Sequence, residues 1–322
     1  MTRVAGGGMF DTVLSRRKTL LVAMSLGSLA QATSILAAIP RYAFSRSWGG
    51  SGTATGRLDG PRGVAVAGDR VYVADSYNNR IQEFTGTGSF TRTWGRFGKG
   101  NGQLNRPRGI AVNSAGQIIV ADTLNHRIQI FTAGGGFLRR FGSHGTANGR
   151  FADPWGVAVG RAGRIYVADS SNNRIQVFNR RGRFIRSWGG RGSVSGKFSY
   201  PRGIATDRQG RIYVVDGGNH RIQMFNARGR FLRSWGREGS ANGSFQDPRD
   251  IAIDRRGRVV VTDTGNERVQ VFTKGGRYQT KWSAATIAPV GFNPMGVAVD
   301  SSNRIYIADT ASDRVEVFTT TG

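Results

Sequence analysis

Short runs of alternating apolar and polar residues fill the chain after residue 40, and the helical period of 3.6 residues is absent from them. A representative run at residues 211–216 reads Arg-Ile-Tyr-Val-Val-Asp and is rich in β-branched side chains. Turns containing glycine and asparagine separate such runs, and the chain holds 48 glycines. The pattern therefore predicts many short strands joined by tight turns.

The strands recur as one repeated unit that begins at a proline. The six prolines are Pro61, Pro107, Pro154, Pro201, Pro248 and Pro294. Successive prolines lie 46 or 47 residues apart, and a period this constant over more than three units indicates a repeat architecture. Four short strands per unit are typical of a propeller blade. We therefore predict an all-β domain over residues 41–322, a six-bladed β-propeller of four-stranded antiparallel blades.

The N-terminal strand is expected to close the ring. The sixth unit ends at Phe318 and a threonine-rich tail, so it lacks a fourth strand. Residues 44–49 match that missing strand and precede the first unit. Completing blade six in this way removes two open sheet edges, which would otherwise invite aggregation.

A second motif, Asp-x-x-Asn-x-Arg-[Ile/Val]-Gln-x-Phe, follows the start of each unit, which reads Pro-x-Gly in five units and Pro-Arg-Asp in the fifth. Together the two motifs resemble the NHL repeat over residues 42–322, with blade six departing at Ser312 and Glu316. The aspartates of the motif are Asp75, Asp122, Asp169, Asp216, Asp263 and Asp309, each five residues before an arginine. Because a function needs only one copy, we interpret these pairs as ion pairs that brace a turn rather than as a ring of catalytic carboxylates.

The first forty residues carry a different signal. Residues 15–20 read Ser-Arg-Arg-Lys-Thr-Leu and resemble a twin-arginine export signal, and Ala-Gln-Ala at residues 30–32 is a candidate cleavage site. The uncharged stretch at residues 19–40 could instead be a buried helix or a single membrane anchor. We predict that residues 1–40 are an export or anchor segment and that the propeller is delivered outside the cytoplasm, as a periplasmic, cell-surface or secreted protein.

The charge is strongly positive. The chain holds 46 lysines and arginines against 20 acidic residues, a net charge of +26. Arginine, which supplies nearly all of these cations, binds phosphate, carboxylate and sulfate through its bidentate fork. The alternative is a compositional bias of the genome. The complete lack of cysteine excludes disulfides, thiol catalysis and cysteine-ligated zinc, so the RING zinc domain often fused to NHL propellers is excluded as well.

The residue after each proline begins the innermost strand and is expected to face the mouth of the central channel. In chain order these residues are Arg62, Arg108, Trp155, Arg202, Arg249 and Met295. Four arginines and a tryptophan predict a mouth that binds an anion or a sugar phosphate. The alternative is a packed plug, in which each arginine lies flat on its neighbour.

The opposite face should carry the turns between strands one and two and between strands three and four of each blade. In blades three to five these turns hold Arg161, Arg164, Arg180, Arg181, Arg183, Arg208, Arg211, Arg228, Arg230, Arg255, Arg256, Arg258, Lys274 and Arg277, here called the basic face. The same turns in the other three blades hold far fewer cations. An even compositional bias does not concentrate charge in this way, so the basic face is a second candidate ligand-binding surface.

Related propeller enzymes indicate where metal ligands would lie in this chain. The resemblance to amidating lyases implies zinc-binding histidines near the channel, and the resemblance to lactonases implies calcium-binding carboxylates there. Only Asp250 lies near the expected channel, and His126 and His220 occupy turns of blades too far apart to share a metal. We therefore expect no catalytic residues, no metal, no cofactor and no enzymatic activity.

The leading hypothesis is a non-catalytic, monomeric binding or scaffold propeller outside the cytoplasm. Its partner would be an anionic cell-surface polymer or an acidic protein, held through arginine-rich surfaces. One alternative is a metal-dependent lyase or lactonase-type enzyme. The other is an RNA-binding NHL propeller, which the export signal argues against. Membrane contact is expected only through an uncleaved N-terminal segment.

Overall fold

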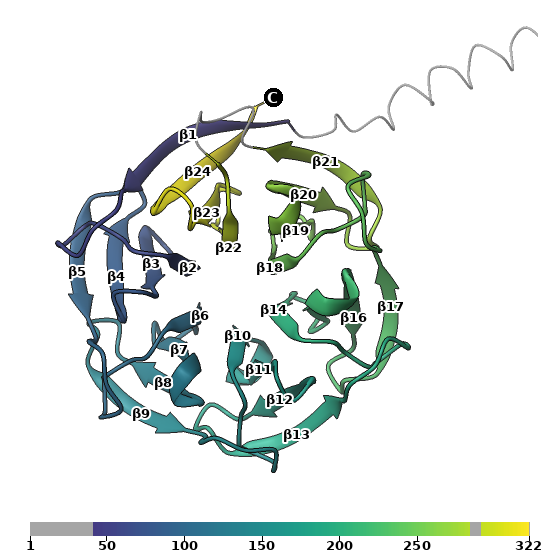
Figure 1. Ribbon diagram of the computed structural model, residues 1–322, viewed down its shortest axis with the longest axis horizontal. Coiled ribbons are helices and arrows are strands. Elements are labelled where there is room, and N and C mark those ends of the chain that lie inside the picture. Colours follow the sequence, from purple (N-terminus) through teal and green to yellow (C-terminus); the bar gives the residue numbers. More distant parts are fainter. Residues whose placement is uncertain (1–40, 284–290, 322) are drawn as a thin grey trace, which may run out of the picture. The chain divides into compact units, whose positions relative to one another are not determined.

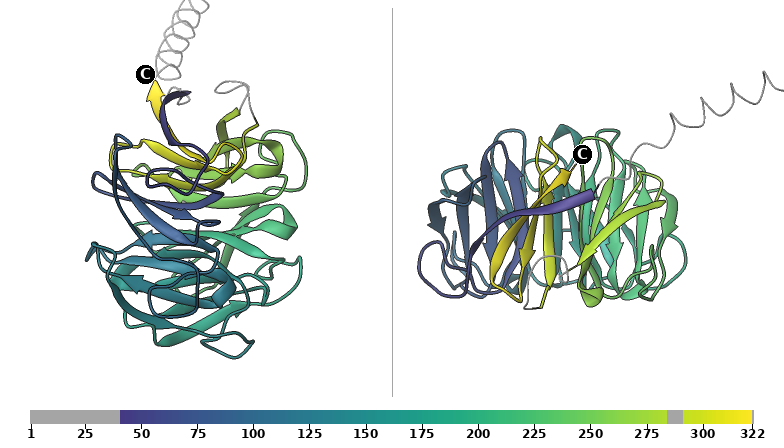
Figure 2. Two further views of the ribbon diagram at one scale, coloured as in Figure 1. Left: turned by 60° about the vertical axis from the view of Figure 1, so that its left-hand side comes forward. Right: turned by 90° about the horizontal axis from the view of Figure 1, so that it is seen from above.

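The computed structural model describes residues 41–283 and 291–321. In this part of the chain the strands form six four-stranded antiparallel sheets, arranged as blades around a central axis (Figure 1). Five blades keep the chain order of their strands from the axis outward, and the side view in Figure 2 shows the sheets standing roughly parallel to the axis. The prediction of a six-bladed, four-stranded propeller is confirmed.

Blade one consists of β2 (Pro61–Ala67), β3 (Arg70–Asp75), β4 (Arg80–Thr85) and β5 (Phe90–Trp94). Blade two consists of β6 (Pro107–Val112), β7 (Ile118–Asp122), η1 (Thr123–Asn125), β8 (Arg127–Phe131) and β9 (Phe137–Phe141). Blade three consists of β10 (Pro154–Val159), η2 (Arg161–Gly163), β11 (Ile165–Asp169), β12 (Arg174–Phe178) and β13 (Phe184–Gly189).

Blade four consists of β14 (Pro201–Thr206), β15 (Ile212–Asp216), η3 (Gly217–Asn219), β16 (Arg221–Phe225) and β17 (Phe231–Trp235). Blade five consists of β18 (Pro248–Ile253), β19 (Val259–Asp263), η4 (Thr264–Asn266), β20 (Arg268–Phe272) and β21 (Tyr278–Ser283). Blade six consists of β22 (Pro294–Val299), β23 (Ile305–Asp309), β24 (Arg314–Thr321) and β1 (Arg41–Gly49).

The hydrophobic core is divided into layers between the blades. Each of six clusters combines side chains of two adjacent blades; Val71 and Phe84 of blade one, for example, pack with Tyr306 and Val317 of blade six. The second strand of a blade is covered on both sheet faces, and every residue of β7 is buried. Full burial on both faces explains why these strands are almost continuously apolar.

The ring is closed by β1, as the sequence predicts. This strand pairs antiparallel with β24, with Phe44 opposite Phe318 and Trp48 opposite Val315. The Trp48 ring packs 6.0 Å from Phe84 of blade one, between ring centroids. The first strand of the propeller thus completes the last blade and also fills the joint with its neighbour.

The aspartate–arginine braces are confirmed in blades one to five. In each, the arginine Nε lies 2.6–2.7 Å from Oδ2 of a fully buried aspartate. Blade six departs from this geometry. Arg314 Nε is 3.9 Å from Asp309, while Arg314 Nη2 is 2.6 Å from Glu316, because the glutamate that replaces the usual glutamine attracts the guanidinium.

The regular tryptophans of the outermost strands pack between blades. A glycine in the third turn of the next blade lies against the rings of Trp48, Trp94, Trp188 and Trp235. At Gly88, with φ +98°, an added Cβ would lie 2.7 Å from the Trp48 ring. The turn therefore needs glycine for both its left-handed backbone and its close approach to the indole.

The predicted export or anchor segment, residues 1–40, lies outside the described residues, and so does the candidate span at residues 19–40. Among the residues that the structure describes, none belongs to a helix of sufficient length and apolar character to cross a bilayer.

Candidate functional site

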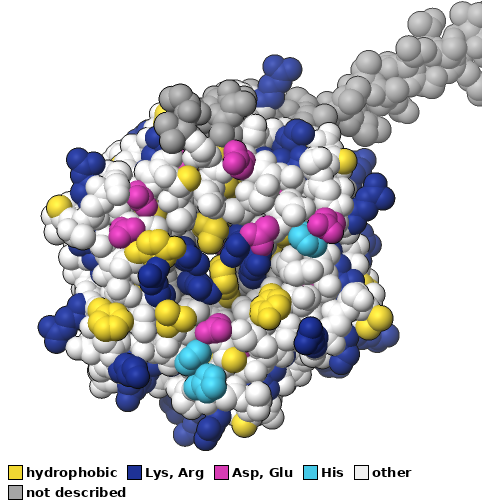
Figure 3. Space-filling model, in the orientation of Figure 1, with side chains coloured by type: hydrophobic (Ala, Val, Ile, Leu, Met, Phe, Trp, Pro, Cys, Tyr) yellow, Lys and Arg dark blue, Asp and Glu magenta, His cyan; other side chains and the backbone are white. Residues whose placement is uncertain are grey.

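The residues that follow the prolines do gather at the channel mouth. The guanidinium carbons of four arginines surround the Trp155 ring, at 3.9 Å from its centroid for Arg108, 5.2 Å for Arg249, 5.5 Å for Arg202 and 5.9 Å for Arg62. Figure 3 shows this face, with basic and apolar side chains together at its centre. Five strands, β2, β6, β10, β14 and β18, thus contribute to one cluster.

Three of these arginines already have polar partners. Asp247, in the loop before β18, bonds both Arg202 and Arg249, with Arg249 Nε 2.8 Å from its Oδ2. Arg62 Nη2 donates to the Tyr77 hydroxyl at 3.1 Å. The two ion pairs hold the pKa of Asp247 below its usual range, so this carboxylate stays charged and offsets part of the positive field.

Arg108 is the exception among the four. Its guanidinium lies closest to Trp155, and its Nε is buried without a hydrogen-bond partner in the described residues. Burial, and then the nearby charge of Arg62, lower the pKa of Arg108 to about 10. Arg108 therefore remains protonated at neutral pH. It forms no direct ion pair with a described residue, and Asp153 is the carboxylate that acts on its charge.

Beneath the mouth, Asp250 occupies a position that is glycine in the other five blades. An added Cβ at Gly63, for instance, would lie 2.0 Å from the Arg108 carbonyl oxygen, so these glycines allow the innermost strands to approach. Asp250 Oδ2 accepts a hydrogen bond from the Val297 amide at 3.0 Å. Burial raises the pKa of Asp250 to about 7.

The channel at this level is nearly filled. A cavity of about 20 Å³ is lined by Arg62, Arg108, Trp155, Asp250 and Met295, enough for about one water molecule. The mouth therefore combines features of both sequence interpretations: a cluster of cations around an aromatic ring, and a plug in which the arginines pack on that ring. Ligand binding at the mouth stays a prediction.

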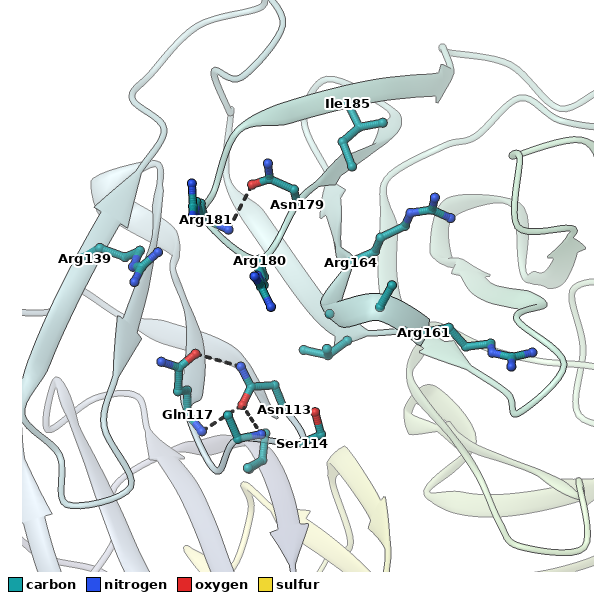
Figure 4. A pocket seen from close by; sticks show the side chains of 16 residues that line it. Asn113, Ser114, Gln117, Arg139, Arg161, Arg164, Asn179, Arg180, Arg181 and Ile185 are labelled. Carbon is teal, nitrogen blue, oxygen red and sulfur yellow. Dashed lines mark hydrogen bonds between the residues drawn. The ribbon is translucent and has the colours of Figure 1, made fainter.

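The two sets of turns predicted to share the opposite face do meet there. A hollow of about 1180 Å³ lies between blades two and three, and both kinds of turn line it (Figure 4). Arg161 and Arg164 come from the β10–β11 turn, whereas Arg180 and Arg181 come from the β12–β13 turn. A smaller hollow of about 250 Å³ lies between blades four and five.

Most of the basic face is available to solvent. Eleven of its fourteen cations are exposed, namely Arg161, Arg180, Arg181, Arg183, Arg208, Arg228, Arg230, Arg255, Arg256, Lys274 and Arg277. Two others brace their own turns: Arg211 Nε lies 2.5 Å from Asp207, and the buried Arg258 lies 2.5 Å from Asp254. These two aspartates are thereby occupied internally, and the exposed cations have no carboxylate partners among the described residues.

One cluster was missed by sequence reasoning. His144, in the loop between blades two and three, lies beside His126, with 4.6 Å between the ring centroids. His126 Nδ1 is 3.5 Å from Asp153 Oδ1, and burial lowers the pKa of this histidine. Only the folding of one loop over another brings these residues together. Across the described residues, no group of three or more histidine, aspartate or glutamate side chains is placed to bind a metal.

Comparison with known proteins identifies the repeats: the chain carries five NHL repeats. The NHL repeat matches five segments, residues 58–84, 104–131, 151–178, 198–225 and 245–272, which cover the central strands of blades one to five. The unmatched blade is the sixth, where Ser312 and Glu316 break the motif. No protein of curated function matches the sequence significantly.

Solved propellers are similar to the chain in fold. A virginiamycin B lyase from Staphylococcus aureus is 16% identical, with a TM-score of 0.61 and coverage of 87% of this chain and 99% of that one. A gluconolactonase from Xanthomonas campestris is 16% identical, with a TM-score of 0.62 and coverage of 88% and 97%. A Bacteroides thetaiotaomicron protein of unknown function is 14% identical, with a TM-score of 0.69 and coverage of 88% and 76%.

These similarities correct one expectation. The prediction of no enzymatic activity, which rested on the missing metal ligands, is contradicted by the structural neighbours, which include a lyase and a gluconolactonase. At 16% identity they show the fold alone and assign no reaction to this chain, since one propeller scaffold supports many activities.

Proposed function

We propose that this chain, a six-bladed propeller of NHL repeats, binds an anionic polymer outside the cytoplasm through its basic face. The polymer is of the cell-surface type, rich in phosphate, sulfate or carboxylate groups. Arginine suits all three groups, because its planar fork donates two parallel hydrogen bonds to a pair of oxygens.

The observation that supports this proposal is that the exposed cations of the basic face lack carboxylate partners among the described residues, whereas the arginines of the braces have them. The basic face has eleven exposed cations, and within the described residues none of them forms an ion pair. The repeated arginines of the braces, by contrast, each contact a buried carboxylate. Like charges held close together without counter-ions create a positive potential that attracts a polyanion.

The channel mouth is less suited than the basic face to binding a polyanion. Asp247 already neutralises Arg202 and Arg249, and the small cavity below admits little more than a water molecule. A ligand at the mouth would have to lie on top of Trp155 and recruit chiefly Arg108. We therefore assign the principal contact to the basic face.

Charge removal tests the assignment. The full chain and its variants are applied to immobilised long-chain polyphosphate, and the salt concentration that elutes each protein is recorded. One variant removes four exposed cations of the basic face: R208Q, R228Q, R255Q and R256Q. Its matched control removes four exposed arginines from the loops that lead from one blade to the next: R96Q, R150Q, R191Q and R237Q.

We expect the basic-face variant to elute at clearly lower salt than the control, although both have lost four charges. Equal shifts would show that net charge alone controls retention and would refute a dedicated face. The location is tested separately by fractionating cells that produce the chain; a protein found only in the cytoplasm at full length would contradict the extracytoplasmic part.

A further inference from the structure

The hollow between blades two and three breaks the symmetry of the repeat at two independent positions. Both positions hold arginines, Arg164 on the turn before β11 and Arg139 on β9, and both side chains line the hollow. In the other blades most arginines at these positions are bonded to the protein; Arg46 of blade six, which lies opposite Val317, is an exception. Here neither side chain forms a hydrogen bond or an ion pair with any described residue.

The first break is the loss of an aspartate. In blades four to six an arginine follows an aspartate by four residues and bonds to it at 2.5 Å, as Arg211 does to Asp207. Blade two has a neutral version, in which Asn113 Nδ2 donates to Gln117 Oε1 at 2.9 Å. In blade three the position of the aspartate is Gly160, so Arg164 keeps its charge without a partner.

The second break concerns the outermost strand of blade two. In blades three and four the arginine equivalent to Arg139 crosses to the next blade: Arg186 Nη2 donates to the Ala227 carbonyl at 2.8 Å, and Arg233 Nη1 donates to the Gly275 carbonyl at 3.0 Å. In blade one the equivalent Arg92 pairs with Glu83 at 3.1 Å. Figure 4 shows Arg139 extending instead toward the turn that carries Arg180 and Arg181.

The lining of the hollow is therefore a set of five arginines without an acid: Arg139, Arg161, Arg164, Arg180 and Arg181. Asparagine and glutamine amides lie beside them, at Asn113, Gln117 and Asn179 (Figure 4). Guanidinium groups from three separate segments suit a tetrahedral oxyanion, which offers several oxygens at once. The hollow, at about 1180 Å³, is much larger than one such group and has room for the sugar that carries it.

We propose that this hollow is the anchoring subsite of the basic face, and that it holds a phosphate or sulfate group borne on a saccharide. Arg139 and Arg164 make the specific contacts. Arg139 is the unbonded arginine at its repeat position in blades one to four, and Arg164 is the unbonded arginine at its repeat position in blades three to six. Both guanidinium groups are therefore available to a ligand. This inference rests on the proposed function, since it names the subsite and the ligand class of that surface.

The test compares two double variants of the full chain that lose equal charge. R139Q/R164Q removes the two unpartnered arginines of the hollow, and R208Q/R255Q removes two exposed arginines of blades four and five on the same face. The probes are a heparin-type sulfated tetrasaccharide and inorganic pyrophosphate, and the dissociation constant of each is measured by titration calorimetry.

For the sulfated tetrasaccharide we expect R139Q/R164Q to weaken binding about tenfold or more, because two charge-assisted hydrogen-bond donors are removed from the ligand. We expect R208Q/R255Q to weaken binding no more than about threefold, because salt screens two charges that lie far from the ligand. Equal weakening by both variants would overturn the subsite while leaving a polyanion-binding face intact. Failure of the unaltered protein to bind any polyanion would instead refute the proposed function. Pyrophosphate binding as tight as that of the tetrasaccharide would overturn the saccharide part.

A third variant restores the missing charge. Gly160→Asp recreates the aspartate of blades four to six, and we expect it to pair with Arg164 and to weaken tetrasaccharide binding. An added Cβ at Gly160 lies 2.8 Å from the Tyr166 ring, so the ring must shift toward the position seen in blade four, where the Tyr213 hydroxyl donates to Asp207 at 3.1 Å. Unchanged affinity in a G160D protein with normal thermal stability would count against a role for Arg164.

Discussion

At the residue scale, the polar side chains that recur at one position in successive blades stabilise the fold. In blades one to five the aspartate of the NHL motif is fully buried, and a hydrogen-bonded arginine, asparagine and glutamine surround it; Asp169, for example, accepts from Asn172, Arg174 and Gln176. A buried charge is tolerated only when it is paired and its lone pairs are satisfied. These networks stabilise the turn and leave little capacity for a ligand.

The brace can be tested by comparing blades three and six. Asp169→Asn leaves Arg174 without its counter-charge, and we expect a loss of about 3 kcal/mol in the free energy of unfolding, the lower end for breaking a buried pair. Asp309→Asn should cost less than half as much, because Arg314 already bonds Glu316. Urea denaturation measures both. A cost for Asp309→Asn equal to that for Asp169→Asn would contradict this account of blade six.

The raised pKa of Asp250 predicts that the free energy of unfolding depends on pH. Its folded-state pKa is raised to about 7, above the ordinary value near 4, so the fold favours the protonated form. The folded state then binds more protons than the unfolded state between these values. The stability contributed by Asp250 is therefore fully present at low pH and is lost as the pH rises from about 4 through about 7.

The measurement is the melting temperature between pH 5 and pH 8, a window set by that raised pKa. Relative to Asp250→Asn, the unaltered protein should become less stable as the pH rises. Asp69→Asn, which removes an exposed carboxyl group, is the matched control and should run parallel to the unaltered protein. A constant difference between the unaltered protein and Asp250→Asn would show that Asp250 does not titrate in this range.

At the element scale, β1 determines whether the ring is closed. It covers the edge of β24 with a register from Arg41 to Gly49, and it brings Trp48 against the core shared by blades six and one. Uncovered strand edges offer unpaired amides and carbonyls to other chains. Closure therefore protects the protein against aggregation as well as stabilising it.

Trp48→Ala should lower the stability by about 3 kcal/mol, the usual cost of truncating a large packed aromatic side chain. Phe44→Ala is the control within the same strand, because Phe44 is 43% exposed, and its effect should be much smaller. Deletion of residues 41–49 should both lower the melting temperature and promote aggregation, followed by light scattering. A deletion variant as stable and monodisperse as the full chain would refute closure by β1.

At the scale of the whole molecule, the departures from sixfold symmetry are concentrated in a few places. Charge gathers on the turns of blades three to five, Asp250 replaces a glycine in one innermost strand, and Gly160 replaces an aspartate in one turn. Asp250 still takes part in the scaffold, because its carboxylate accepts a hydrogen bond from the Val297 amide. The other two departures are the places where we propose that a ligand is recognised.

The net charge of +26 predicts a strong salt dependence for any polyanion complex. Binding of polyphosphate by the full chain should weaken by tenfold or more between about 50 and about 200 mM salt, because the ligand releases condensed counter-ions on binding. A logarithmic plot of affinity against salt gives the number of phosphate groups neutralised, and the basic-face variant should show a shallower slope. An affinity that does not change with salt would exclude an electrostatic contact.

The amino-acid sequence by itself determined the architecture of the propeller, including the number of blades and the closing strand. Repeat period and strand alternation are local properties, and each unit must bury its apolar faces against equivalent neighbours. The braces were predictable for the same reason, since the aspartate and its arginine lie five residues apart across one turn.

Only the tertiary structure decided which cations are free. Arg139 and Arg186 occupy the same position of the repeat, yet Arg186 donates to the Ala227 carbonyl of the next blade, whereas Arg139 lines a hollow. Asp247 lies in a loop and was not recognised as the partner of two mouth arginines, because one of them belongs to another blade. Neutralisation of a charge depends on distances between atoms of different segments, and those distances exist only after the blades have packed.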